Sequence, residues 1–207
     1  MKKAKLSLFA GIIAAGSMLA ATQANALDRG EMLANTCVGC HGAGGLSNGP
    51  AIPSIAGYAY YPEESDMELK GYFVSSMLNY RDAERPATIM NRIAKGYTDQ
   101  DILDMAAYFA KQKHVSVEQK FDKKMALAGE KLHDKYCEKC HSEAGMNADD
   151  DAGFLGGQWK PYLHYNLTDF LSGDREMDKK MAKKLNSLYD KHGQEGIDQL
   201  VEFYSSK

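Results

Sequence analysis

Cys37-Val38-Gly39-Cys40-His41 is the stretch that decides how this 207-residue chain is interpreted. The same spacing returns 100 positions later as Cys137-Glu138-Lys139-Cys140-His141, and the two motifs contain all four cysteines of the chain. Cys-x-x-Cys-His is the attachment signature of c-type haem, in which two thiols form thioethers with the porphyrin and the histidine binds its iron. We therefore expect two covalent haem c groups, attached through Cys37, Cys40, Cys137 and Cys140, with His41 and His141 as axial ligands.

Three other interpretations of the motifs fit the sequence less well. A redox dithiol is disfavoured because no βαβ pattern surrounds either motif. A zinc ribbon places two Cys-x-x-Cys pairs about 15–20 residues apart, whereas 96 residues separate Cys40 from Cys137. Ordinary disulfides in an exported protein would not require a histidine after each second cysteine. The duplication of the complete motif favours haem.

The N-terminus has the pattern of an export signal. Three lysines within the first five residues precede an uncharged, mainly apolar run from Leu6 to Ala21, and Ala24-Asn25-Ala26 supplies a small-x-small cleavage pattern. The apolar run is shorter than the ~20 residues that a membrane span requires. We expect residues 1–26 to be a cleaved signal peptide, the mature chain to lack a membrane span, and its location to be the periplasm. An uncleaved N-terminal anchor is the alternative.

Charge and composition exclude other classes of function. The chain has 25 basic and 28 acidic residues and a net charge of −3, which gives no electrostatic basis for binding nucleic acid. The glycine-rich stretch from Gly42 to Gly49 lacks the preceding strand, the following helix and the downstream acidic residue of a dinucleotide site. We therefore expect no flavin or nicotinamide in this chain.

The repeat extends beyond the two motifs. A Gly-x-x-Leu element precedes each motif, and each half ends in a helical pattern with apolar residues at i, i+3, i+4 and i+7, which must be buried against another element. Thr98 and Asp101 resemble a capping box at the start of the first of these helices, whereas the second is entered through glycines. The repeated residues are Gly30 with Leu33 and Gly129 with Leu132, then Ile102, Met105, Ala106 and Phe109 with Ile197, Leu200, Val201 and Tyr204.

No alternating β pattern of useful length occurs, so the sequence predicts an all-α fold of two tandem domains, each wrapped around a covalent haem. We expect the domains at residues 27–113 and 123–207, joined by a polar linker over residues 114–122. Domains of this size bury little apolar surface by themselves, so we also expect each to fold poorly without its haem.

The second axial ligand of each iron sets its chemistry, because methionine gives an electron carrier whereas an open site binds ligands. Met90, just ahead of the first closing helix, is the expected ligand in the first half. Met77 is the other candidate, but its helical spacing is typical of a methionine that fills the core. In the second half Met181 is favoured by its spacing, and Met177 is the alternative. The carbonyl of Pro50 or Pro53 is expected to accept the Nδ1 proton of His41; no proline stands at that place in the second half.

The sequence resembles the periplasmic two-domain, two-haem class I cytochromes c, and within them the cytochrome subunits of flavocytochrome c sulfide dehydrogenases. The resemblance spans the mature chain, and the string that ends in the second haem motif is its most specific part. The residues that carry it are Thr88-Ile89-Met90, Arg92 to Tyr97, Lys131 to His141, Gly157-Gln158-Trp159, Pro161-Tyr162-Leu163 and Met177 to Leu185.

This resemblance implies an electron-transfer subunit that is not catalytic on its own. A separate flavoprotein subunit, carrying FAD and forming a heterodimer with this chain, would oxidise sulfide and pass single electrons to the two haems. The electrons would continue to a soluble acceptor cytochrome. The alternative is a free-standing di-haem cytochrome c that carries electrons to a terminal oxidase. A haem enzyme or gas sensor with an open axial site is disfavoured by the methionines in both halves.

Overall fold

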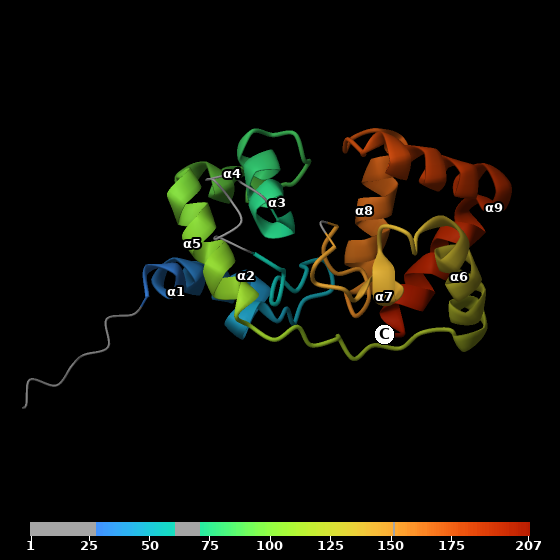
Figure 1. Cartoon of the computed structure of the whole chain (residues 1–207), viewed down its shortest axis with the longest axis horizontal. Helices are drawn as coiled ribbons and strands as arrows, with labels where there is room; N and C mark the ends of the chain where they lie inside the picture. Colours follow the sequence, from blue (N-terminus) through green and yellow to red (C-terminus); the bar gives the residue numbers. More distant parts are fainter. Residues whose placement is uncertain (1–27, 61–70, 151) are drawn as a thin grey trace, which may run out of the picture.

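The computed structural model describes residues 28–60, 71–150 and 152–207, and all its regular elements in these ranges are helices. Figure 1 shows two helical groups side by side, joined by an extended segment that runs along one edge. This agrees with the predicted all-α fold. The first group contains α1 (Arg29–Ala34), α2 (Val38–His41), α3 (Tyr72–Arg81), α4 (Met90–Ile93) and α5 (Asp99–Ala110); the second contains α6 (Lys123–Tyr136), α7 (Ser142–Gly145), α8 (Lys160–Ser172) and α9 (Lys179–Ser205).

In each half the helix before the haem motif crosses the closing helix at a glycine. A Cβ added at Gly30 in α1 would lie 2.3 Å from the carbonyl oxygen of Asp104 in α5. A Cβ added at Gly129 in α6 would lie 2.0 Å from the carbonyl oxygen of Gln199 in α9. Both approaches are far closer than packed atoms allow, so only glycine permits these crossings. The repeated Gly-x-x-Leu elements therefore mark where the helices meet.

The two closing stripes are buried, as predicted. Each lies in a separate hydrophobic cluster, to which the helices of its own half contribute most of the side chains. Phe154 of the second half also joins the first cluster. The buried stripe residues are Ile102, Met105, Ala106 and Phe109 in α5 and Ile197, Leu200, Val201 and Tyr204 in α9.

The closing helices begin differently. In α5 the Thr98 hydroxyl accepts a hydrogen bond from the Asp101 amide at 3.2 Å, and the Asp101 carboxylate accepts one from the Thr98 amide at 2.8 Å, which confirms the predicted capping box. The long α9 is broken at Gly193, where φ is 59° and ψ is −153°. This conformation is open to glycine and strained for other residues. Figure 1 shows α9 changing direction along its length, and the buried stripe residues all lie in the part of α9 after Gly193.

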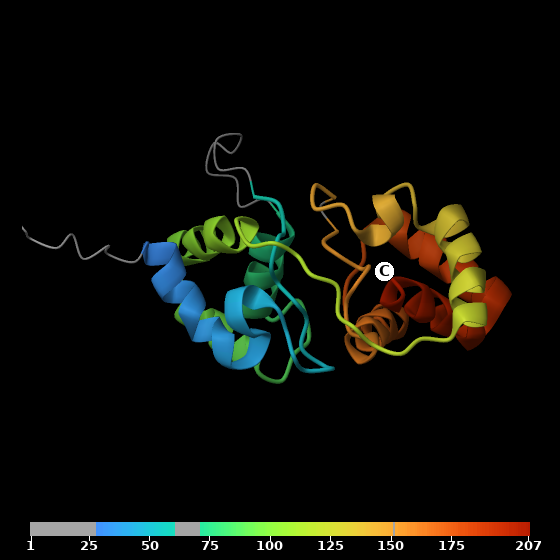
Figure 2. The same ribbon diagram turned by 90° about the horizontal axis from the view of Figure 1, so that it is seen from below.

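The segment between the halves is fastened to the second half. Residues 113–122 contain no helix, and Figure 2 shows this stretch crossing from one half to the other. The Val117 amide donates to the Gly157 carbonyl at 2.8 Å, and the Asp122 amide donates to the Glu202 carboxylate at 2.7 Å. The chain between the halves is therefore held to the second half at Val117 and at Asp122.

One group of direct contacts between the halves involves Gln158, whose side chain is fully buried. Its amide oxygen accepts from the Ser54 amide at 3.0 Å, and its amide nitrogen donates to the Ser54 carbonyl at 2.8 Å. The indole of Trp159 donates to the Ser47 carbonyl at 3.1 Å. Because an unpaired buried polar group is costly, these bonds favour one arrangement of the two halves.

Candidate haem sites

The first motif forms a compact turn that buries its histidine. Cys37 ends a short 3₁₀ turn (Asn35–Cys37), and α2 carries Cys40 and His41. The His41 Nδ1 lies 2.9 Å from the Pro53 carbonyl oxygen, which confirms the expectation for one of the two prolines. A carbonyl only accepts hydrogen bonds, so Nδ1 carries the proton and Nε2 is left with a free lone pair. Burial lowers the pKa of His41, which also favours the neutral ring that binds a metal.

The second motif has the same spacing but a different surrounding. The loop that follows each motif is closed by matching backbone bonds, from Ile55 to Gly45 at 2.7 Å and from Leu155 to Gly145 at 2.9 Å. Since both pairs are displaced by 100 positions, Gly153 stands where the first half has Pro53. Among the described residues, nothing hydrogen-bonds the buried Nδ1 of His141. Burial lowers the pKa of His141 as well.

Three candidate methionines, Met90, Met177 and Met181, lie partly buried against the hydrophobic clusters. Met90 opens α4, Met181 lies in the first turn of α9, and Met177 directly precedes the N-cap Asp178. Met77 is almost fully buried within the first cluster. Four residues after Met90 comes the buried Ala94, and four residues after Met181 comes the buried Leu185. This matching register supports Met181 as the counterpart of Met90, and the assignment stays a prediction.

The donor groups in each half fit a covalent haem c. Each motif offers two thiols, and all four cysteines are free. Burial raises the pKa of the Cys37 thiol and that of Cys137, the latter to about 11. Cys40 and Cys140 are exposed at the surface. Each half offers two thiols for the porphyrin, a neutral imidazole, and a thioether packed against the same hydrophobic cluster as one of the thiols; this is the set of groups that a low-spin c-type haem requires.

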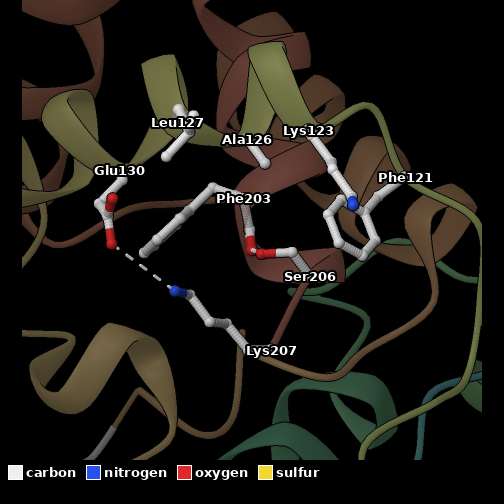
Figure 3. A pocket seen from close by; sticks show the side chains of 8 residues that line it. All are labelled: Phe121, Lys123, Ala126, Leu127, Glu130, Phe203, Ser206 and Lys207. Atoms are coloured by element: carbon white, nitrogen blue, oxygen red, sulfur yellow. Dashed lines mark hydrogen bonds and ion pairs between the residues drawn. The ribbon is translucent and has the colours of Figure 1, made fainter.

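His133 and a pocket near the C-terminus lie outside the candidate haem ligands. His133 is buried, shares a hydrogen bond with the Tyr204 hydroxyl at 2.9 Å and contacts the Glu138 carboxylate, so it is a core residue with both ring nitrogens hydrogen-bonded. A shallow pocket lies near the C-terminus between α6 and the end of α9, where Lys207 pairs with Glu130 at 3.8 Å (Figure 3). None of its lining residues is a candidate haem ligand.

Sequence analysis missed the polar residues that join the two halves. Gln158 lies within one of the strings that carry the family resemblance, which predicts no role for it, and no sequence pattern singles out Arg85. Both residues lie in segments without a periodic pattern, and their partners are distant in sequence. Gln158 lies 104 positions from its partner Ser54, and Arg85 lies 77 positions from its partner Tyr162. The type of residue is the one signal in the sequence that could have found Arg85, because this arginine follows shortly after Tyr72 and Tyr80.

The motifs and helices define a di-haem c-type cytochrome, and comparison with known proteins confirms this class. The cytochrome c family matches residues 27–113. Cytochrome c4 of Pseudomonas aeruginosa is 35% identical over 159 residues, which covers 72% of this chain and 73% of that protein. The crystal structure of reduced recombinant cytochrome c4 from Pseudomonas stutzeri superposes with a TM-score of 0.67 at 27% identity, covering 85% of this chain and 95% of that one. The chain belongs to the cytochrome c4 family of di-haem electron-transfer proteins.

The resemblance to sulfide dehydrogenases holds over a shorter stretch. The cytochrome subunit of sulfide dehydrogenase from Chlorobaculum tepidum is 40% identical over 81 residues, which covers 39% of this chain and 64% of that subunit. The cytochrome c4 match therefore extends over more of the chain, and the family assignment rests on it. Within the described ranges, no helix combines the length and apolarity needed to cross a membrane.

Proposed function

We propose that this chain is a periplasmic electron-transfer subunit that accepts electrons from a flavoprotein sulfide dehydrogenase and passes them to a soluble acceptor. The observation that carries the proposal is the pair of complete haem motifs in two contacting halves, together with the 40% identity to a sulfide dehydrogenase cytochrome subunit. A reduced flavin holds two electrons, whereas a haem takes one. Two haems in one chain therefore match the output of one flavin.

In this function the protein supplies attachment, ligation and burial, and the haems supply one-electron exchange. The thiols of Cys37, Cys40, Cys137 and Cys140 would attach the two groups. His41 and His141 would bind one face of each iron. Met90 would bind the other face in the first half, and Met181, or Met177 in its place, would do so in the second. No residue of this chain is assigned to act on sulfide, so catalysis belongs to the flavoprotein and its FAD.

The periplasmic location rests on the export pattern of residues 1–26, which lie outside the described residues, and on the chemistry of haem attachment. The expected cleavage follows Ala26. A net charge of −3 gives no electrostatic basis for binding nucleic acid, so a protein partner suits this chain better.

The second candidate is a free-standing di-haem carrier that serves a terminal oxidase without a flavoprotein. It is favoured by one observation, the longer coverage of the cytochrome c4 match. Both candidates use the same haem sites, so they differ only in the donor and in whether the chain occurs alone.

Affinity purification from the native host distinguishes them. We expect the tagged chain to co-purify with a second polypeptide that shows flavin absorbance, and sulfide to reduce both haems of that complex. The matched control is the chain alone, which sulfide should reduce far more slowly. A chain that elutes alone, without flavin absorbance, overturns the sulfide dehydrogenase assignment and leaves the free-standing carrier.

A further inference from the structure

A hydrogen-bonded network runs through the core of the second half, from a surface carboxylate to a cysteine that attaches haem. His133 of α6 is 1% exposed, and its two ring nitrogens contact the Tyr204 hydroxyl of α9, at 2.9 Å, and the Glu138 carboxylate. The Tyr204 hydroxyl also hydrogen-bonds with the Cys137 thiol. Since the Glu138 side chain is 45% exposed, the network connects the solvent with the sulfur of the second haem motif.

The end of α6 brings these groups together. The His133 carbonyl accepts hydrogen bonds from the amides of Cys137 and Glu138, at 2.7 and 2.9 Å, so the backbone folds back on the last turn of the helix as the motif begins. The rings of Phe203 and Tyr204 lie with their centroids 5.0 and 5.5 Å from that of His133. Helix α6 and the end of α9, which pack against each other (Figure 1), thus enclose the imidazole.

The carboxylate fixes the direction of the hydrogen bonds in the network. A carboxylate only accepts, so the Nε2 of His133 carries the proton that faces Glu138. A charged ring is costly at a buried position, and the neutral ring has a lone pair on Nδ1, to which the Tyr204 hydroxyl donates. Burial raises the pKa of Tyr204 well above its ordinary value, so the phenol keeps this proton. The lone pairs of the Tyr204 oxygen are left to face Cys137.

The first half has apolar side chains at all three corresponding positions. The closing stripes, the haem motifs and the crossing glycines give the correspondence: Ala34, Val38 and Phe109 stand where the second half has His133, Glu138 and Tyr204. A Cβ added at Gly45 would lie 3.1 Å from the Phe109 ring, and one added at Gly145 would lie 3.2 Å from the Tyr204 ring, so the two rings occupy matching places. None of the three apolar side chains can hydrogen-bond, so the same network cannot form in the first half.

The hydroxyl near the equivalent cysteine of the first half has different partners. Thr36 Oγ1 lies 3.9 Å from Cys37 Sγ, donates to the Leu33 carbonyl at 2.7 Å and shares a hydrogen bond of 2.7 Å with the Tyr97 hydroxyl. Each of these partners is neutral. Within the described residues, the two attachment sulfurs therefore differ in the charge to which their neighbouring hydroxyls are linked.

We propose that Glu138, His133 and Tyr204 form a relay that brings the charge of a surface carboxylate to the Cys137 sulfur and thereby lowers the potential of the second haem. Hydrogen bonds in series polarise one another inside a protein, so the relay makes the Tyr204 oxygen more negative. A thioether sulfur has no proton to offer that oxygen, and negative potential beside the porphyrin favours ferric iron. The inference requires the second haem and is independent of the flavoprotein donor, so either can fail while the other stands.

Spectroelectrochemical titration of the isolated di-haem protein tests the relay. Tyr204→Phe removes the hydroxyl and keeps the ring, as Phe109 does in the first half. We expect the potential of one redox wave to rise and that of the other to stay unchanged. The matched control is Tyr189→Phe, at an exposed position of the same helix, which should move neither wave. Unchanged waves in Tyr204→Phe, or a fall in potential, would overturn the proposal.

A double-substitution cycle separates the relay from the direct field of the carboxylate. Glu138→Gln should raise the potential of the same wave. Asp134→Asn is the matched control, because a carboxylate oxygen of this exposed residue lies within 4.8 Å of a His133 ring nitrogen and of a Glu138 oxygen. In the Tyr204→Phe background we expect Glu138→Gln to raise the potential no more than Asp134→Asn does. A Glu138→Gln shift of the same size in both backgrounds would show a charge acting through space and would overturn the relay.

The two carboxylate variants also serve if Tyr204→Phe fails to fold, since both replace side chains that reach the solvent. A relayed charge should make the rise in potential clearly larger in Glu138→Gln than in Asp134→Asn. Equal rises in these two variants would show that the hydrogen bonds carry no charge to the haem.

Discussion

The side-chain amide of Gln158 pairs with both backbone groups of Ser54, accepting from its N–H at 3.0 Å and donating to its carbonyl at 2.8 Å. A side chain of the second half thus satisfies both backbone hydrogen-bonding groups of a residue in the first half. Since both partners are buried, the pairing joins the two haem-binding halves without access to water.

Removing that amide should weaken the contact between the halves. Gln158→Leu keeps the volume but leaves the Ser54 N–H and carbonyl unpaired, which we expect to cost about 2–4 kcal/mol of unfolding free energy. Calorimetry should show a lower melting temperature and a wider separation between the transitions of the two halves. Gln194→Leu, at an exposed position on α9, is the control. Equal effects of the two substitutions would show that the pairing contributes nothing specific.

The glycine at the crossing of α6 and α9 should resist enlargement. A methyl group at Gly129 would lie 2.0 Å from the Gln199 carbonyl oxygen, so the helices must separate. We expect Gly129→Ala to lower the unfolding free energy by roughly 1–3 kcal/mol, as overpacked sites do. Chemical denaturation measures this. Gly96→Ala is the control, since nothing lies within 4 Å of a Cβ added there; a loss at Gly96 as large as at Gly129 would contradict the packing explanation.

The axial methionines are tested by their charge-transfer band to ferric iron. Met90→Ala should remove the band of one haem and lower its potential, because a thioether ligand favours ferrous iron. Met181→Ala should do the same for the other haem if Met181 is the ligand, with Met177→Ala as the competing assignment. Met77→Leu, a volume-conserving change in the core, should retain both bands. An unchanged spectrum in Met90→Ala would remove Met90 from the iron.

Each half should depend on its haem for stability. In Cys137→Ala with Cys140→Ala the second half cannot attach its haem, and the apolar surface that the haem would cover stays open to water. We expect loss of helix signal from α6 to α9 by circular dichroism, and fast amide exchange there, while the first half stays protected. A haem-free second half with native-like helix content and a cooperative melt would contradict this.

Patterns that act locally could be predicted from the sequence. The buried stripes of α5 and α9 follow from helical spacing, the capping box from Thr98 and Asp101, and the His41 hydrogen bond from a proline placed shortly after the motif. The pairing of Gln158 with Ser54 could not be predicted, because it joins positions 104 apart that no periodicity relates. The same holds for Arg85, whose role depends on which half packs against its loop.

The second half also shows where a repeat in sequence stops implying a repeat in structure. Gly153 takes the place of Pro53, and among the described residues the Nδ1 of His141 has no hydrogen-bond partner. The motif spacing is the same in both halves, so the difference lies in the loops that follow the motifs. Equivalent motifs therefore need not hold their histidines equally.

The bonds along residues 113–122 have a consequence for the rate at which charge moves within the molecule. Two domains joined by a flexible linker diffuse relative to each other. Each electron transfer between them would then wait for an encounter whose frequency depends on the length of the linker. Here Val117 and Asp122 fasten the connection to the second half. Together with the Gln158–Ser54 bonds that join the two halves, this attachment holds the halves in one arrangement before an electron arrives, so electron transfer between them should be insensitive to solvent viscosity.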